Sequence, residues 1–96
     1  MTHTKASSLL LAHEHDLHEL GVASVALFGS VVRGEAHEAS DVDVLVRFSK
    51  PVGLFEFLEV QFFLEALFGC KVDLVTEDAL KPQLQERIVS EAVWVV

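Results

Sequence analysis

The sequence predicts an α/β domain (α+β, two-layer) in which helices pack against a small mixed sheet. Segments with helical spacing of apolar residues alternate with short runs of β-branched residues, and glycine or proline separates them. Hydrophobic residues make up 51% of the 96 residues, which is enough for one packed core. We therefore expect a single domain over residues 1–96, with the order helix, strand, helix, strand, helix, strand, helix.

The chain is expected to begin with a helix over residues 6–20. Its apolar positions recur at helical spacing and are Leu10, Leu17 and Leu20. Gly21 follows at the position where a left-handed residue often ends a helix.

Three strands are predicted after this helix. Residues 22–28 are β-branched and small apolar residues, typical of a strand buried on both faces. Residues 41–48 alternate valines with other side chains, and residues 71–76 form a shorter run of the same kind. The polar segment 29–40 has room for one helical turn.

Two more helices are predicted in the second half of the chain. Residues 54–68 are expected to form a long helix that ends at Gly69. Residues 81–92 are expected to form the last one, with Pro82 near its start, where a missing N–H does no harm. The apolar tail 92–96 fits either a short strand or a docking segment.

Charge and composition exclude several classes of protein. The chain has 7 Lys and Arg against 15 Asp and Glu, a net charge of −8, so we expect no direct nucleic-acid ligand. The single cysteine, Cys70, forms no internal disulfide, and nothing at the N-terminus reads as a signal peptide. Four polar residues interrupt the longest apolar stretch: Glu56, Glu59, Gln61 and Glu65. We expect a cytoplasmic protein with no membrane segment.

Asp41 and Asp43 are the first candidates for chemistry. Side chains of a strand alternate between its faces, so these carboxylates project from the same face, about 6–7 Å apart. Adjacent carboxylates repel unless they share a cation, and a divalent metal with oxygen ligands, Mg²⁺, is the economical explanation. The alternative is a solvated strand start with two exposed acids.

Gly29 and Ser30 end the first strand in a turn of the kind that holds phosphate. This turn meets the acid pair only if the first two strands run antiparallel. Asp73 lies near the start of the third strand, which follows a helical crossover, and such a crossover usually joins parallel strands. All three carboxylates then lie at one end of a mixed sheet, a layout that suits phosphoryl or nucleotidyl transfer with two metal ions.

Together these segments resemble a known family. The motifs are Phe28-Gly29-Ser30-x-x-Arg33-Gly34, Ser40-Asp41-x-Asp43 and Val72-Asp73-Leu74-Val75. They are similar to those of the polymerase-beta-like nucleotidyltransferase superfamily, most closely its minimal nucleotidyltransferase (MNT) group. The resemblance covers residues 9–94 and implies the nucleotidyltransferase fold.

The resemblance implies Mg²⁺-dependent transfer of AMP from ATP, with two Mg²⁺ ions beside the bound nucleotide. The matching catalytic and metal-binding acids are Asp41, Asp43 and Asp73, and the matching nucleotide-binding residues are Gly29, Ser30, Arg33 and Ser40. MNT proteins commonly act as antitoxins of a HEPN ribonuclease toxin, adenylylating one of its tyrosines. Val31 and Val32 depart from the family pattern, which weakens the case for phosphate contacts from those positions.

Several roles remain open at this point. Arg33 either contacts a triphosphate or pairs with a nearby acid such as Glu35 or Asp41, and Ser40 either hydrogen-bonds the turn or takes part in catalysis. Two other functions also fit: a binding module that neutralises its partner by occlusion, and a nucleotidyltransferase acting on a small molecule.

Two further features concern surfaces rather than chemistry. The three histidines His13, His15 and His18 lack the spacing of a helical zinc site, so a solvated helix face is expected. The phenylalanines of helix 54–68 surround most of its circumference, which predicts contact with another chain, either the toxin or a second copy. The same holds for the apolar tail. The alternative is that these phenylalanines are oversized core residues.

Overall fold

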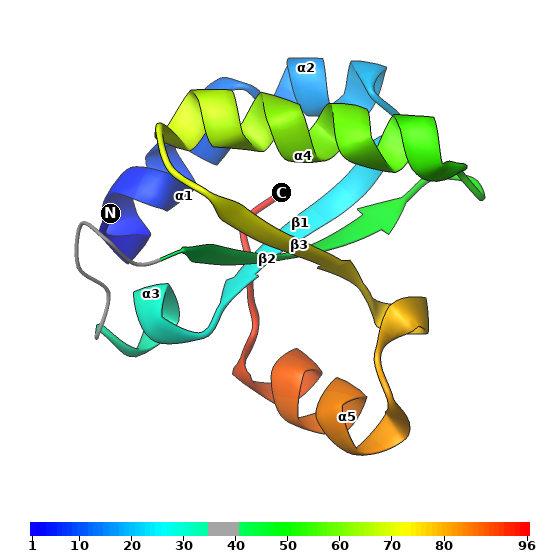
Figure 1. Cartoon of the computed structure of the whole chain (residues 1–96). Coiled ribbons are helices and arrows are strands. Elements are labelled where there is room, and N and C mark those ends of the chain that lie inside the picture. Colours follow the sequence, from blue (N-terminus) through cyan, green and yellow to red (C-terminus); the bar gives the residue numbers. More distant parts are fainter. Residues whose placement is uncertain (35–40) are drawn as a thin grey trace.

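The computed structural model describes residues 1–34 and 41–96 and confirms the predicted α/β fold (Figure 1). Helices alternate with strands in nearly the predicted order. The elements are α1 (His3–Ala12), α2 (Glu14–Glu19), β1 (Val22–Phe28), α3 (Ser30–Arg33), β2 (Val42–Phe48), α4 (Leu54–Phe68), β3 (Val72–Thr76), the 3₁₀ turn η1 (Glu77–Ala79), α5 (Pro82–Glu91) and β4 (Val93–Trp94).

The four strands form one mixed sheet in the order β3-β2-β1-β4. The predicted strand directions are confirmed: β1 and β2 are antiparallel, whereas β2 and β3 are parallel and joined through α4. Helix α4, with α1 and α2, covers one face of the sheet, and α5 lies on the other (Figure 1). The beginnings of β2 and β3 therefore meet the end of β1 at one edge.

The predicted single helix over residues 6–20 is wrong in its start and in its continuity. The hydroxyl of Thr2 accepts a hydrogen bond from the Lys5 N–H at 3.1 Å, so α1 already begins at His3. His13 then interrupts the helix, with its ring edge-on to Phe63 of α4 at 6.0 Å between centroids. Two short helices result, and Gly21 ends the second with a positive φ of 89°.

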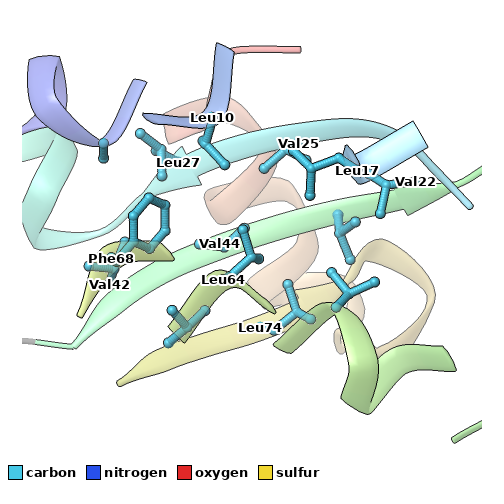
Figure 2. Packing of buried hydrophobic residues seen from close by; sticks show 14 of the residues in the cluster. Leu10, Leu17, Val22, Val25, Leu27, Val42, Val44, Leu64, Phe68 and Leu74 are labelled. Carbon is cyan, nitrogen blue, oxygen red and sulfur yellow. The ribbon is translucent and has the colours of Figure 1, made fainter. Parts of the chain in front are cut away.

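The larger core lies between the sheet and helices α1, α2 and α4 (Figure 2). Its fully buried side chains include Leu10, Leu17, Val25, Leu27, Val44 and Leu64. A smaller cluster on the other face joins Ala26, Phe28 and Leu45 to apolar residues of α5. Truncating a buried leucine to alanine costs about 2–5 kcal/mol, so the larger cluster dominates stability.

The C-terminal tail adds a strand to the protein's own sheet. β4 pairs with β1 in antiparallel register, with Leu27 opposite Val93, and the N–H of Val25 donates to the carbonyl of Val96. Val95 and Val96 pack against the larger core. Of the two interpretations of the tail, the short strand is confirmed, so the apolar character of its end is explained within the chain.

Helix α4 is buried on one side and bare on another. Val60, Leu64 and Phe68 lie in the core, whereas Phe55 and Phe62 are 81% and 63% exposed. The phenylalanines are therefore not all core residues. Among the described residues, none of the helices combines the length and the apolar character needed to cross a bilayer.

Candidate active site

Three aspartates meet at the edge where β2 and β3 begin. Asp43 lies opposite Asp73 in the parallel register and opposite Phe28, the last residue of β1, in the antiparallel one. Asp41 lies directly before β2, which begins at Val42, one residue later than predicted. The sheet thus brings together the three acids that the sequence motifs single out.

Backbone and side-chain hydrogen bonds hold this edge in place. The N–H of Val42 donates to the Lys71 carbonyl at 3.0 Å, which joins the beginnings of β2 and β3. Helix α4 supports the same point: Gln61 donates to the Val72 carbonyl at 3.3 Å, and the Glu65 carboxylate accepts from the Val72 N–H at 3.2 Å. Asp73 therefore sits on a backbone fixed from two sides.

The Asp43 carboxyl has a pKa raised above its ordinary value. Partial burial is the largest cause, because it disfavours the charged form, and the negative charges of Asp73 and Asp41 act in the same direction. The positive charge of Arg33 opposes them, and Glu91 adds to the rise. This edge of the sheet therefore concentrates negative charge around a half-buried carboxylate.

Gly29 brings the backbone of the turn against that carboxylate. Its φ of 73° lies in the left-handed region, and a Cβ placed on it would stand 2.1 Å from Asp43 Oδ2. No other residue fits without displacing Asp43. Ser30 follows as the first residue of α3, where the N–H groups of Val32 and Arg33 donate to the Gly29 carbonyl at 3.1 Å.

The sequence did not predict the presence of Glu91 at this edge. Arg33, at the end of α3, donates to the carboxylate of Glu91, the last residue of α5, at 2.5 Å. The sequence suggested for Arg33 either a triphosphate or a nearby acid such as Glu35 or Asp41, and Glu35 lies outside the described residues. Glu91 lies 58 residues away, and the only advance signal was its place just before the apolar tail.

Comparison with known proteins identifies the family of this chain. The nucleotidyltransferase domain family matches residues 12–95. The protein adenylyltransferase MntA of Thermococcus cleftensis is 44% identical over 96 residues, which are 99% of this chain and 97% of the relative. The chain belongs to the nucleotidyltransferase family.

Solved structures place this nucleotidyltransferase in the minimal group, which confirms the resemblance and the enzyme class. A structure identified as a minimal nucleotidyltransferase superposes with a TM-score of 0.83 at 36% identity, covering 97% of this chain and 95% of that one. A chain from a complex of tri-AMPylated Shewanella oneidensis HEPN toxin with MNT antitoxin shares the fold, with a TM-score of 0.61, 18% identity, and coverage of 90% and 71%.

The donor set of the nucleotidyltransferase suits Mg²⁺ shared with a ligand. Within residues 1–34 and 41–96, no three His, Cys, Asp or Glu side chains converge on one point that would hold a metal by themselves. Mg²⁺ usually takes only one or two carboxylates and completes its shell with water and substrate phosphates. Asp41 and Asp43 provide such a pair; the pKa of Asp43 is raised by burial and then by the negative charges of Asp73 and Asp41, which a cation would offset.

The remaining candidates have simple positions. Ser40 and Glu35 lie outside the described residues. His15 and His18 are exposed, while His13 is half-buried with its Nδ1 3.0 Å from Asp16 Oδ2, so the predicted solvated histidine face holds for two of the three. Cys70 is half-buried against the larger core.

A hollow of about 610 Å³ lies at the other end of the sheet, near the ends of β2 and β3. Its charged side chains are Arg47, Lys50, Glu77 and Asp78. The hollow is not a candidate for the catalytic site, because it holds as many acids as bases and Arg47 already pairs with Glu77.

Proposed function

We propose that this nucleotidyltransferase transfers AMP from ATP to a partner protein. The observation that carries the proposal is the Asp43 carboxylate, which faces the backbone of Gly29 and lies in register with Asp73. The turn that follows β1 and a group of acids thus share one edge of the sheet. Support for a protein acceptor comes from the 44% identical relative, which is a protein adenylyltransferase.

In the proposed reaction each residue has a role. Asp41 and Asp43 would hold Mg²⁺, which when bound supplies positive charge to the phosphates and to the attacking oxygen. Gly29 and Ser30 would bind the phosphates of ATP, and we include Ser40 among the nucleotide contacts. The acceptor hydroxyl attacks the α-phosphorus, the bond to the bridging oxygen breaks, and pyrophosphate leaves. Asp73 would either hold a second ion or take the hydroxyl proton.

For the acceptor we propose a tyrosine of a HEPN-type toxin. The support is the fold shared with the complex of AMPylated HEPN toxin and MNT antitoxin, together with the exposure of Asp41 and Asp73 to solvent. A protein hydroxyl needs such access, whereas a small acceptor would need walls of its own. In this function the chain is an antitoxin.

We further propose that the bare side of α4 receives this partner. Phe55 and Phe62 are largely exposed, and the acids Glu56 and Glu59 lie beside them on the same helix. A second copy would bring the same acids and a net charge of −8 against each other, which disfavours a homo-oligomer through this face. The fitting occupant is a toxin surface with apolar side chains surrounded by Lys or Arg.

The test incubates the chain and its toxin with ATP and Mg²⁺ and weighs both proteins by mass spectrometry. We expect the toxin to gain AMP, and Asp41→Asn to reduce the rate by at least about 10²-fold, because the cation loses a ligand. Asp78→Asn at the far end removes the same charge and should leave the rate unchanged.

The docking face is tested separately by the affinity for the toxin. Phe55→Glu should weaken that affinity about tenfold or more without changing ATP binding, while Leu84→Glu, on an exposed apolar position of α5, should not. The second candidate function, neutralisation by occlusion, is favoured by this same bare face. It would be supported if Asp41→Asn still neutralised the toxin fully without any AMP transfer.

A further inference from the structure

The contact between Arg33 and Glu91 joins two distant parts of the chain at the site. The guanidinium Nη1 and the Glu91 Oε1 are 2.5 Å apart, and the side chains are 45% and 23% exposed. Ion pairs with this much solvent access contribute little to stability. Stability alone therefore explains the contact poorly, and its position suggests a role at the site.

The register of the sheet fixes where Glu91 stands. Leu27 of β1 lies opposite Val93 of β4 in an antiparallel pair. Gly29 follows Leu27 by two residues, and Glu91 precedes Val93 by two residues. The pairing of β4 with β1 therefore brings the end of α5 close to the phosphate-binding turn, and the contact between Arg33 and Glu91 joins them.

Electrostatics explains what Glu91 does there. Arg33 and Glu91 both act on the charge of Asp43, so the pair lies within the field of the metal-binding acids. Without Glu91, less would oppose the attraction between the Arg33 guanidinium and those carboxylates, and a bidentate pair there would occupy oxygens that a cation needs. Glu91 offers the guanidinium an alternative acid close by.

We propose that Glu91 is a positioning residue, which holds the Arg33 guanidinium beside the phosphate-binding turn, ready for the triphosphate and away from the metal-binding aspartates. This inference rests on the proposed function, because it assumes that ATP binds at the turn. Glu91 acts through Arg33 and need not touch the substrate. It also makes β4 and α5 part of the site, although every motif of the family precedes them.

A double-mutant cycle tests the proposal by titrating ATP with Mg²⁺ into the full chain and measuring the dissociation constant calorimetrically. Glu91→Gln should weaken ATP binding roughly five- to tenfold, and Arg33→Met by at least as much. In the Arg33→Met background, Glu91→Gln should add nothing. The matched control Glu86→Gln removes an exposed acid from the same helix and should leave the affinity unchanged.

Transfer kinetics and thermal melting separate positioning from a structural role. With a positioning role, Glu91→Gln raises the KM for ATP while kcat at saturating ATP stays within about twofold and the Tm is unchanged. ATP affinity equal to that of the unsubstituted chain, or a loss that persists in the Arg33→Met background, would overturn the inference alone. Absence of ATP binding to the unsubstituted chain would overturn the proposed function, and this inference with it.

Discussion

The two ends of the sheet carry charge in opposite arrangements. At the far end, Arg47 donates to Glu77 at 2.7 Å, and its guanidinium lies 4.1 Å from the centre of the Trp94 ring. At the near end, Arg33 pairs with Glu91, and the pKa of Asp43 is raised by burial and by the negative charges of Asp73 and Asp41. Balanced charge joins elements of the fold, whereas the excess of acids at the near end fits the cation that we propose there.

The largest expected effect on stability and AMP transfer comes from a substitution at Gly29. Gly29→Ala combines a strained positive φ with a Cβ that overlaps Asp43 Oδ2, so we expect a loss of about 2 kcal/mol or more in the free energy of unfolding and of about 10²-fold in AMP transfer. Denaturant unfolding and the transfer assay measure the two effects.

Gly69→Ala is the matched control for that substitution. Gly69 has nearly the same φ, 72°, and ends α4 four residues before Asp73, but no atom of the described residues lies within 4 Å of its Cβ position. We expect about 1–2 kcal/mol of lost stability and unchanged transfer per folded molecule. Equal losses of transfer in both variants would mean that backbone strain, rather than the contact with Asp43, accounts for the effect.

The far end should respond in stability alone. Arg47→Met removes the ion pair with Glu77 and the contact with Trp94, and we expect about 1 kcal/mol of lost stability with transfer within about twofold of the unsubstituted chain. Thermal unfolding measures the first effect. Lys50→Met, which removes a charge from the same hollow, should change neither quantity; a strong loss of transfer in Arg47→Met would contradict the division between the two ends.

The smallest effect concerns pH. A raised pKa means that the folded chain holds the Asp43 proton more tightly than the unfolded chain, so ionised Asp43 destabilises the fold at neutral pH. Asp43→Asn should therefore be more stable than the unsubstituted chain at pH 7, by less than about 1 kcal/mol because the group is partly solvated. The difference should shrink as the pH falls through the folded pKa toward the unfolded value near about 3.9. A difference that stays constant with pH would contradict this origin.

Much of the site follows from local sequence. The alternation within strands places Asp41 and Asp43 on one face, and the helical crossover through residues 54–68 predicts that β3 runs parallel to β2. Gly29, which follows β1, also predicts a turn there. The helix boundaries were harder to predict from the sequence. The start of α1 depends on one hydrogen bond to Thr2, and the break at His13 accompanies one ring contact with Phe63 of α4.

What the sequence by itself determined is the set of elements, the acids at the start of two strands and the turn beside them, because spacing of two, three or four residues encodes these directly. Only the tertiary structure decided that the tail closes on β1, that Asp43 fits against a residue without a Cβ, and that Arg33 meets Glu91. Those contacts depend on strand order and register across the whole chain, and no local periodicity carries that information.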